Sequence, residues 1–213
     1  YSASKAACEI AISSWKESFC GSKFNQNQFL SIASARSGNV IGGGDWAQDR
    51  IIPDVIRSLQ NNEKIFIRNP KSTRPWQHVL DPLAGYISLA EKLYESKNKL
   101  YEDSHNIFAS AFNFGPNISS NKTVEFLVNE IIKYWPGTVI KNHDDSNQFH
   151  EAKKLQLQID KAFNFLNWEP IWNLEVSLKK TVEWYKKFRE DSYSSFDLCT
   201  SDIKCYEKNF FEV

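Results

Sequence analysis

Residues 29–60 read FLSIASARSGNVIGGGDWAQDRIIPDVIRSLQ and decide the fold class. The run from Phe29 to Ala35 is apolar and ends in small residues, which is typical of a buried strand in a parallel sheet. A glycine-rich turn follows over residues 38–46. Pro53 then opens a predicted helix that continues to about Gln60, because proline suits the first turn of a helix. A strand, a turn and a helix in this order indicate an α/β protein with parallel strands.

The rest of the chain repeats this alternation. Apolar residues at helical spacing predict further helices over residues 2–19, 81–94, 123–135, 160–166 and 174–188, with a last one from about residue 201. Short apolar runs predict strands over residues 64–68, 111–114, 139–141 and 155–159. Thr123 is expected to cap the helix that follows it, because a threonine hydroxyl can accept a hydrogen bond from a free backbone N–H.

The composition is that of a globular protein with balanced charge. The 213 residues (24.7 kDa) carry 26 Lys or Arg and 26 Asp or Glu, so the formal net charge is zero. A nucleic-acid or membrane-surface partner would require a basic excess or a basic face, and no run approaches the ~18 apolar residues of a membrane-spanning helix. We therefore expect neither a nucleic-acid nor a membrane partner.

The number and spacing of the cysteines indicate the cellular setting. They stand at positions 8, 20, 199 and 205, without a C-x-x-C pair and without a histidine at metal-ligand spacing. A chain of this length with so few cysteines does not depend on a disulfide framework. We expect a reducing, cytoplasmic setting and no metal site.

The glycines at residues 42–44 lack the G-x-G-x-x-G spacing that places a dinucleotide phosphate at a helix N-terminus. Asp45 follows them directly and would repel a phosphate. We interpret this segment as a flexible turn. The chain also begins at Tyr1 and contains no methionine, so we expect it to be the downstream part of a longer protein whose dinucleotide site precedes residue 1.

Tyr1 and Lys5 share one face of the predicted first helix, because residues four apart lie above one another. A free phenol titrates near ~10 and is a poor base at neutral pH. A neighbouring ammonium group favours the phenolate and lowers that pKa, which suits a general base. The spacing alone is weak, since a tyrosine and a lysine four apart also occur as a solvated pair.

Longer motifs accompany this pair in a fixed order. They occupy residues 1–9, 35–46, 49–54, 68–83, 112–116, 150–152 and 166–170. Together they resemble the extended short-chain dehydrogenases, the NAD-dependent epimerases and dehydratases that act on nucleotide sugars. From residue 39 onward the motifs are most similar to the CDP-glucose 4,6-dehydratase group of that family. The resemblance runs from residue 1 to about residue 188.

The resemblance implies a fold and a reaction. The fold would be the C-terminal portion of a Rossmann-type parallel sheet with a small mixed α/β substrate-binding domain, whose elements lie mainly in residues 39–80 and 117–213. CDP-glucose would lose water to give CDP-4-keto-6-deoxyglucose, with NAD as a transient hydride acceptor. Tyr1 would take the hydroxyl proton at sugar carbon 4, and Lys5 would also contact the nicotinamide ribose. The full enzyme would be a homodimer.

The elimination step needs an acid/base pair that the family carries before its catalytic tyrosine. That pair would precede residue 1. We therefore expect the 213 residues to form a truncated domain that is inactive alone.

The resemblance also implies a set of substrate-binding residues. They are Asn39, Arg50, Arg68, Arg74, Asn113 and His150. Arginine forks and neutral amides are the groups that a diphosphate requires, which agrees with this set.

Each of these residues also has a structural alternative. Arg50 could pair with Asp45 or Asp49, the other two arginines could be solvated or paired at the surface, and Asn39 could be a turn residue. Asn113 could hold the following turn, and a lone histidine is more often structural. The tryptophans at positions 76, 168 and 172 are expected to be packing residues, although an aromatic ring could stack on cytosine.

Two other functions stay open. One is a different nucleotide-sugar epimerase or dehydratase, which an analysis of the product would distinguish. The other is a non-catalytic binding or dimerisation remnant that associates through the small and apolar residues of the first helix, namely Ala3, Ala7, Ile10 and Ala11.

Overall fold

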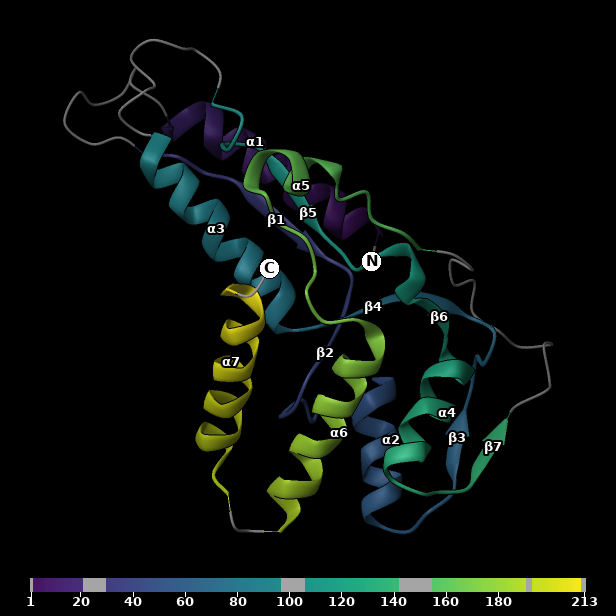
Figure 1. The fold of residues 1–213 in the computed structure, drawn as a ribbon. Helices are drawn as coiled ribbons and strands as arrows, with labels where there is room; N and C mark the ends of the chain where they lie inside the picture. Colours follow the sequence, from purple (N-terminus) through teal and green to yellow (C-terminus); the bar gives the residue numbers. More distant parts are fainter. Residues whose placement is uncertain (1, 21–29, 97–105, 142–154, 191–192, 212–213) are drawn as a thin grey trace. The chain divides into compact units, whose positions relative to one another are not determined.

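The computed structural model describes residues 2–20, 30–96, 106–141, 155–190 and 193–211. The chain divides into two compact units (Figure 1). Unit 1 comprises residues 1–36, 83–114 and 158–168, and unit 2 comprises residues 37–82, 115–157 and 169–213. Each unit gathers segments that are distant in sequence.

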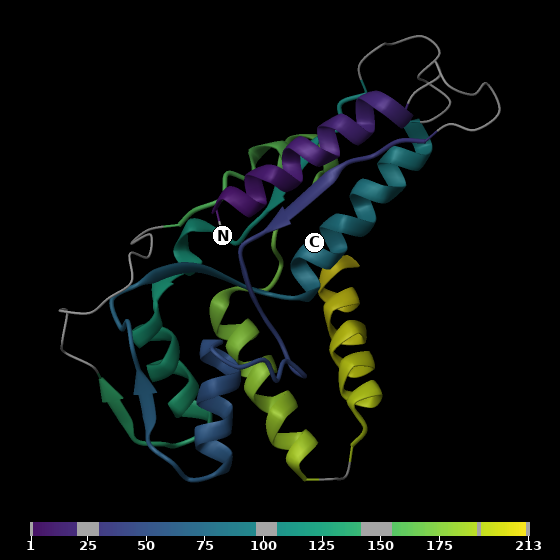
Figure 2. The ribbon, with the colours of Figure 1, turned by 180° about the vertical axis from the view of Figure 1, so that it is seen from behind.

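Unit 1 combines a two-stranded sheet with helices. The sheet pairs β1 (Ser34–Ser37) with β5 (Ala111–Phe114), and the helices are α1 (Ser2–Phe19), most of α3 (Leu80–Ser96) and α5 (Asp160–Leu166). Helix α1 runs beside β1 in both views of the ribbon (Figures 1 and 2). The buried core consists of Leu89, Phe112, Phe114, Ala162, Leu166 and Trp168. Gly85 lets α3 lie against the Phe114 ring, because a Cβ there would collide with it.

Unit 2 contains two small sheets. In the first, β2 (Asn39–Ile41) pairs in parallel with β4 (Thr73–His78), which pairs antiparallel with β6 (Asn121–Thr123). In the second, β3 (Ile65–Ile67) pairs in parallel with β7 (Val139–Lys141). The helices are α2 (Ile51–Gln60), α4 (Val124–Tyr134), α6 (Leu174–Arg189), α7 (Ser195–Phe211) and the short η1 (Ile118–Ser120).

The core of unit 2 follows from apolar periodicity. In α2 the buried aliphatic residues recur three or four apart, as an amphipathic helix requires; they are Ile52, Val55, Ile56 and Leu59, and Pro53 is buried beside them. Local polar groups set where two other helices begin. The Thr123 hydroxyl accepts a hydrogen bond from the Phe126 N–H (3.1 Å), and Asn173 accepts one from Val176 (2.9 Å). The predicted Thr123 cap is therefore confirmed.

Most predicted elements are confirmed, several to the residue. The bounds of α1, β5, β7 and α5 agree with the sequence prediction. The α/β class with parallel pairing is also confirmed. The last helix begins at Ser195, six residues before the predicted start.

One predicted strand does not form, and another forms only in part. No strand forms over residues 155–159. There the Gln158 carbonyl accepts a hydrogen bond from the Asn113 side chain (3.2 Å), and Ile159 packs on the core of unit 1. Of the run predicted over residues 29–35, only Ser34 and Ala35 are in β1, since residues 30–33 are irregular and Phe29 lies outside the described residues.

Three strands, β2, β4 and β6, were not predicted. Strand β4 is rich in polar residues and contains Pro75, so it lacks the alternation that marks a strand. Among the helices that the structure describes, none is long and apolar enough to cross a bilayer.

Candidate functional site

The glycine turn after β2 is filled by an aromatic side chain from α6. A Cβ at Gly43 would fall on the Trp184 ring, so only glycine allows this approach. The Tyr185 hydroxyl donates a hydrogen bond to the Asp45 carbonyl (2.6 Å), which holds the turn to the same helix. The prediction of a flexible turn was therefore wrong. The turn is packed, and the indole occupies the space that a bound phosphate would need.

Trp46 continues this packed segment but keeps part of its ring in solvent. Its side chain contacts the edge of Tyr185 at a centroid distance of 5.1 Å, and Phe188 lies 6.1 Å away. The Arg57 guanidinium donates a hydrogen bond to the Trp46 carbonyl (3.0 Å). The loop over residues 45–50, which we call the acidic loop, is thus fixed from both α6 and α2.

Two of the predicted substrate-binding arginines pair with the acidic loop. Arg50 precedes α2 and lies 2.9 Å from an Asp45 carboxylate oxygen, while Arg68 follows β3 and lies 3.0 Å from Asp49. Both guanidinium groups remain accessible, since the arginine side chains are 67% and 64% exposed. Arg50 occupies the N-cap position of α2, and its side chain makes no cap hydrogen bond. The structure therefore brings two accessible arginines to one loop.

Asn39 and Arg74 lie on the β2–β4–β6 sheet. Asn39 is paired with Trp76 of β4, and Arg74 is paired with Lys122 of β6. Arg74 is half-buried and donates a hydrogen bond to the Thr73 carbonyl (2.9 Å). Both residues belong to unit 2, as do Arg50 and Arg68.

The remaining site candidates lie in unit 1 or outside the described residues. Lys5 is exposed on α1 of unit 1. Asn113 on β5 donates to the Gln158 carbonyl and lies 3.5 Å from Arg36, so its amide connects elements of unit 1. Tyr1 and His150 lie outside the described residues.

An ion pair in unit 1 was not singled out from the sequence. Arg36 donates to the Glu9 carboxylate (2.6 Å), and the Ser34 hydroxyl donates to the same group (3.1 Å). The Arg36 hydrogen bond lowers the pKa of Glu9 and raises that of the arginine. These contacts tie α1 to β1 by polar groups.

A buried polar cluster in unit 2 was also missed. Asp81 is fully buried, and one of its oxygens accepts hydrogen bonds from the Ile171 N–H and the Tyr206 hydroxyl, both 2.9 Å. Burial raises the pKa of Asp81 to about 6. Because Tyr206 is 125 residues away in sequence, no local pattern predicts this contact.

His78 lies in the same region and is 2% exposed. Its Nδ1 accepts a hydrogen bond from the Leu80 N–H (3.3 Å), and its ring meets the edge of Trp172 at 4.7 Å. Burial, and next the positive charge of Lys180, lower the pKa of His78 to about 4, so the imidazole is neutral at physiological pH.

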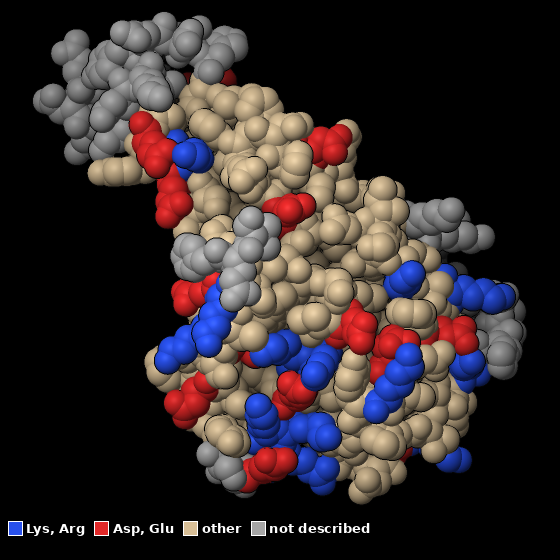
Figure 3. Space-filling view, in the orientation of Figure 1, with Lys and Arg blue, Asp and Glu red and all other residues tan. Residues whose placement is uncertain are grey.

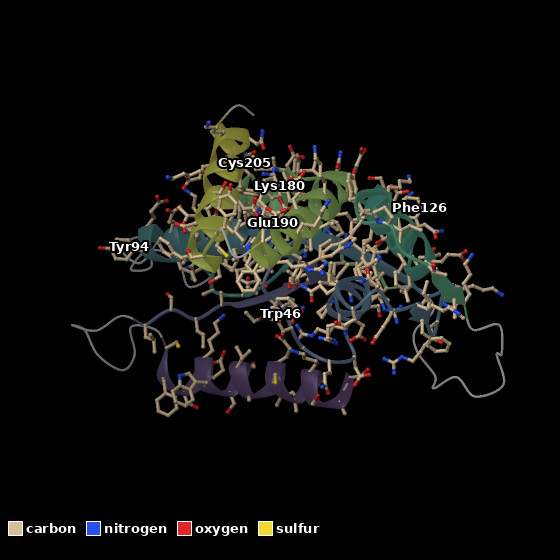
Figure 4. The ribbon with its side chains drawn as sticks, turned by 90° about the horizontal axis from the view of Figure 1, so that it is seen from below. Trp46, Tyr94, Phe126, Lys180, Glu190 and Cys205 are labelled. Carbon is tan, nitrogen blue, oxygen red and sulfur yellow. The ribbon has the colours of Figure 1, made fainter. Side chains whose placement is uncertain are left out.

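Lys180 of α6 and Cys205 of α7 lie near each other (Figure 4). The lysine ammonium group is 3.3 Å from the Asp202 carboxylate and 5.5 Å from the Trp172 ring centre. Burial raises the pKa of Asp202. These contacts attach α7 to α6. All four cysteines are free thiols, and no group among the described residues could hold a metal ion.

Acidic and basic side chains are intermixed over α4 and α6 on the face shown in Figure 3. Three tryptophans expected to be packing residues are 2–5% exposed, which confirms that role; they are Trp76, Trp168 and Trp172.

Comparison with known proteins defines the class. Residues 1–102 match the model of the NAD dependent epimerase/dehydratase family. The chain is also 44% identical over 186 residues to the CDP-glucose 4,6-dehydratase of Salmonella typhimurium (strain LT2), a match that covers 87% of this chain and 50% of that protein. The chain belongs to the NAD dependent epimerase/dehydratase family.

Two further relatives agree with this class. The dTDP-D-glucose 4,6-dehydratase of Mus musculus is 26% identical over 194 residues, covering 88% of this chain and 47% of that protein. The crystal structure of a dTDP-glucose 4,6-dehydratase from Bacillus anthracis, in complex with NAD, superimposes with a TM-score of 0.65 at 21% identity, covering 89% of this chain and 53% of that one. This likeness confirms the Rossmann-type fold of these enzymes. The chain spans about half the length of the curated relatives that it matches.

Proposed function

We propose that this chain is part of a dehydratase that converts CDP-glucose to CDP-4-keto-6-deoxyglucose. The observation that carries the proposal is the pair of accessible guanidinium groups, Arg50 and Arg68, which meet on one loop beside a helix N-terminus. Guanidinium forks and free backbone N–H groups bind phosphate oxygens, so the two arginines suit the diphosphate of a nucleotide sugar when it replaces the Asp45 and Asp49 carboxylates as their partner. The 44% identity to a CDP-glucose 4,6-dehydratase supports cytidine as the base.

Unit 2 would carry the substrate. The predicted substrate-binding elements, residues 39–80 and 117–213, fall almost entirely in unit 2, which supports a separate substrate-binding part. Arg74 and Asn39 would add hydrogen-bond donors on the β2–β4–β6 sheet of the same unit. His150 and Asn113 stay predictions as substrate contacts.

The family implies NAD as the cofactor. Among the described residues, Lys5 is the one that we assign to contact it. The glycine turn at residues 42–44 does not fit a pyrophosphate, because Trp184 fills it. Lys5 would contact the nicotinamide ribose from α1. NAD, when bound, supplies a hydride acceptor and donor. Tyr1 would accept the substrate hydroxyl proton, with Lys5 four residues along favouring the phenolate.

We also propose that the whole enzyme is a homodimer in the cytoplasm. Helix α1 has no buried residue, and its Ile10, Trp15 and Phe19 side chains are 71%, 55% and 57% exposed, which supports association through this helix. The same exposure favours the alternative of a non-catalytic association remnant. The four free thiols agree with a reducing compartment.

Calorimetric titration of the purified chain tests the substrate proposal. We expect CDP and CDP-glucose to bind, and cytidine without phosphate to bind more weakly. Replacing either arginine (Arg50→Met or Arg68→Met) should weaken CDP binding by about ten- to a hundred-fold, because a hydrogen bond to a charged group is worth about 1.5–3 kcal/mol.

Lys133→Met is the matched control, since it removes a cation from a side chain of α4 that is 64% exposed and pairs with Glu130 one turn away. CDP binding that is unchanged in both arginine variants would contradict a diphosphate site on this loop. Preference for another nucleoside diphosphate would reassign the chain to a different nucleotide-sugar dehydratase or epimerase.

A further inference from the structure

The two carboxylates of the acidic loop have different surroundings. Asp45 accepts a hydrogen bond from the Ala47 N–H (3.0 Å) in addition to its ion pair with Arg50, so it also shapes the loop. Asp49 is 80% exposed, and its one hydrogen-bond partner among the residues that the structure describes is Arg68. The Asp49 carboxylate therefore has no structural role in the loop beyond this pair.

The backbone conformation of Asp49 sets the position of its carboxylate. Its φ of 61° lies in the left-handed region, which aspartate and asparagine tolerate better than most residues. The pair that results is weak, because exposed ion pairs contribute little and are screened by salt. An anion that offers more than one oxygen can displace it at small cost.

We propose that the Asp49 carboxylate competes with a nucleotide diphosphate for the Arg68 guanidinium. The diphosphate displaces this carboxylate when it binds. The inference rests on the proposed function, in which Arg68 contacts that diphosphate. The Asp49 carboxylate accepts its hydrogen bond from one Nη of Arg68. A phosphate that binds the same edge of the guanidinium through two N–H groups must take the place of that carboxylate. The freed Asp49 is already hydrated, but its negative charge stays near the anion and weakens its binding. Asp49 thus lowers affinity and speeds ligand release.

The competitor can be removed without altering the loop backbone. Asp49→Asn keeps a residue that tolerates the left-handed conformation and removes the charge. We expect this variant to bind CDP and inorganic pyrophosphate about 2- to 5-fold more tightly at low salt, a change of the size that exposed pairs produce. The gain should shrink at high salt because the repulsion is screened. Binding of cytidine should not change.

Asp54→Asn is the matched control. It removes the same charge from the first turn of α2, but Asp54 pairs with Arg57 and not with the two candidate arginines. Its effect on CDP binding should be clearly smaller than that of Asp49→Asn. Equal gains in the two variants would mean that only net charge matters, and the competitor proposal would be overturned.

A double-mutant cycle with Arg68→Met separates this inference from the proposed function. If Asp49 acts mainly through Arg68, the Asp49→Asn gain is clearly smaller in the Arg68→Met background, where only the repulsion between Asp49 and the anion is left. If Arg68→Met weakens CDP binding but Asp49→Asn changes nothing, the diphosphate site stands and the competitor does not. If neither Arg50→Met nor Arg68→Met changes CDP binding, the site on this loop is wrong and the competitor is wrong with it.

Discussion

Helices α1 and α6 have similar lengths but opposite relations to the unit that contains them. Helix α1 spans 18 residues of unit 1 without one buried residue, whereas α6 spans 16 residues of unit 2 and buries seven. Polar contacts hold α1, chiefly the Arg36–Glu9 pair and the Lys16 hydrogen bond to the Ala109 carbonyl. Apolar packing holds α6, with the Leu178 and Tyr185 side chains fully buried. Helix formation and helix burial are therefore separate properties, and only α6 is stabilised by a core.

Truncation of one side chain in each helix should give the largest difference in the free energy of unfolding. Leu178→Ala in α6 should lower the free energy of unfolding by about 2–5 kcal/mol, because it leaves a cavity in a packed core. Ile10→Ala in α1 should change it by less than about 0.5 kcal/mol, since this side chain is 71% exposed. Urea unfolding followed by circular dichroism measures both. A loss above about 1 kcal/mol for Ile10→Ala that depends on protein concentration would show that a second copy covers α1.

The buried acid and imidazole of unit 2 should give opposed pH dependences of about 3 kcal/mol each. The folded pKa of Asp81 is raised from 3.8 to about 6, so its contribution to stability is present at low pH and is lost as the pH rises through 6. The folded pKa of His78 is lowered from 6.5 to about 4, so its contribution is present above 6.5 and is lost as the pH falls toward 4. In the native chain the two slopes largely cancel.

Two variants should separate these slopes. Asp81→Asn leaves the imidazole, so stability should fall more steeply than in the native chain between pH 6.5 and 4. His78→Asn keeps an acceptor for the Leu80 N–H and leaves the acid, so stability should rise over the same interval relative to the native chain. Urea unfolding at several pH values measures both. Parallel curves for all three proteins would contradict the assigned pKa values.

A smaller loss of stability than in the buried core is expected at the N-cap of α4. Thr123→Ala should destabilise the protein by about 1 kcal/mol, because the Phe126 N–H loses its acceptor. Thr123→Ser keeps the hydroxyl and should restore most of the loss. Urea midpoints measure both variants, and equal losses for alanine and serine would assign the effect to the methyl group and not to the cap.

The sequence predicts elements whose signals are local. The bounds of α1, β5 and α5 follow from apolar spacing and short apolar runs, and the cap of α4 follows from one threonine. Strand β4 could not be predicted in this way, since its register is set by pairing with β2 and β6 and its own residues are mostly polar.

The site was predictable as a set of residue types but not as an arrangement. The arginines were identified, and pairing with Asp45 or Asp49 was left open for Arg50; the structure shows Asp45 as its partner and Asp49 as the partner of Arg68. The packing of Trp184 on Gly43 joins residues far apart in the chain, so the spacing of the glycines alone predicted a flexible turn.

That aromatic filling fixes the position of the glycine turn relative to α6. Because the indole occupies the space above Gly43 and the Tyr185 hydroxyl grips the next carbonyl but one, a tilt of α6 carries residues 43–46 with it. Helix α6 is in turn attached to α7 through Lys180 and Asp202. The position of the loop that contains Arg50 therefore depends on packing that extends through α6 to α7.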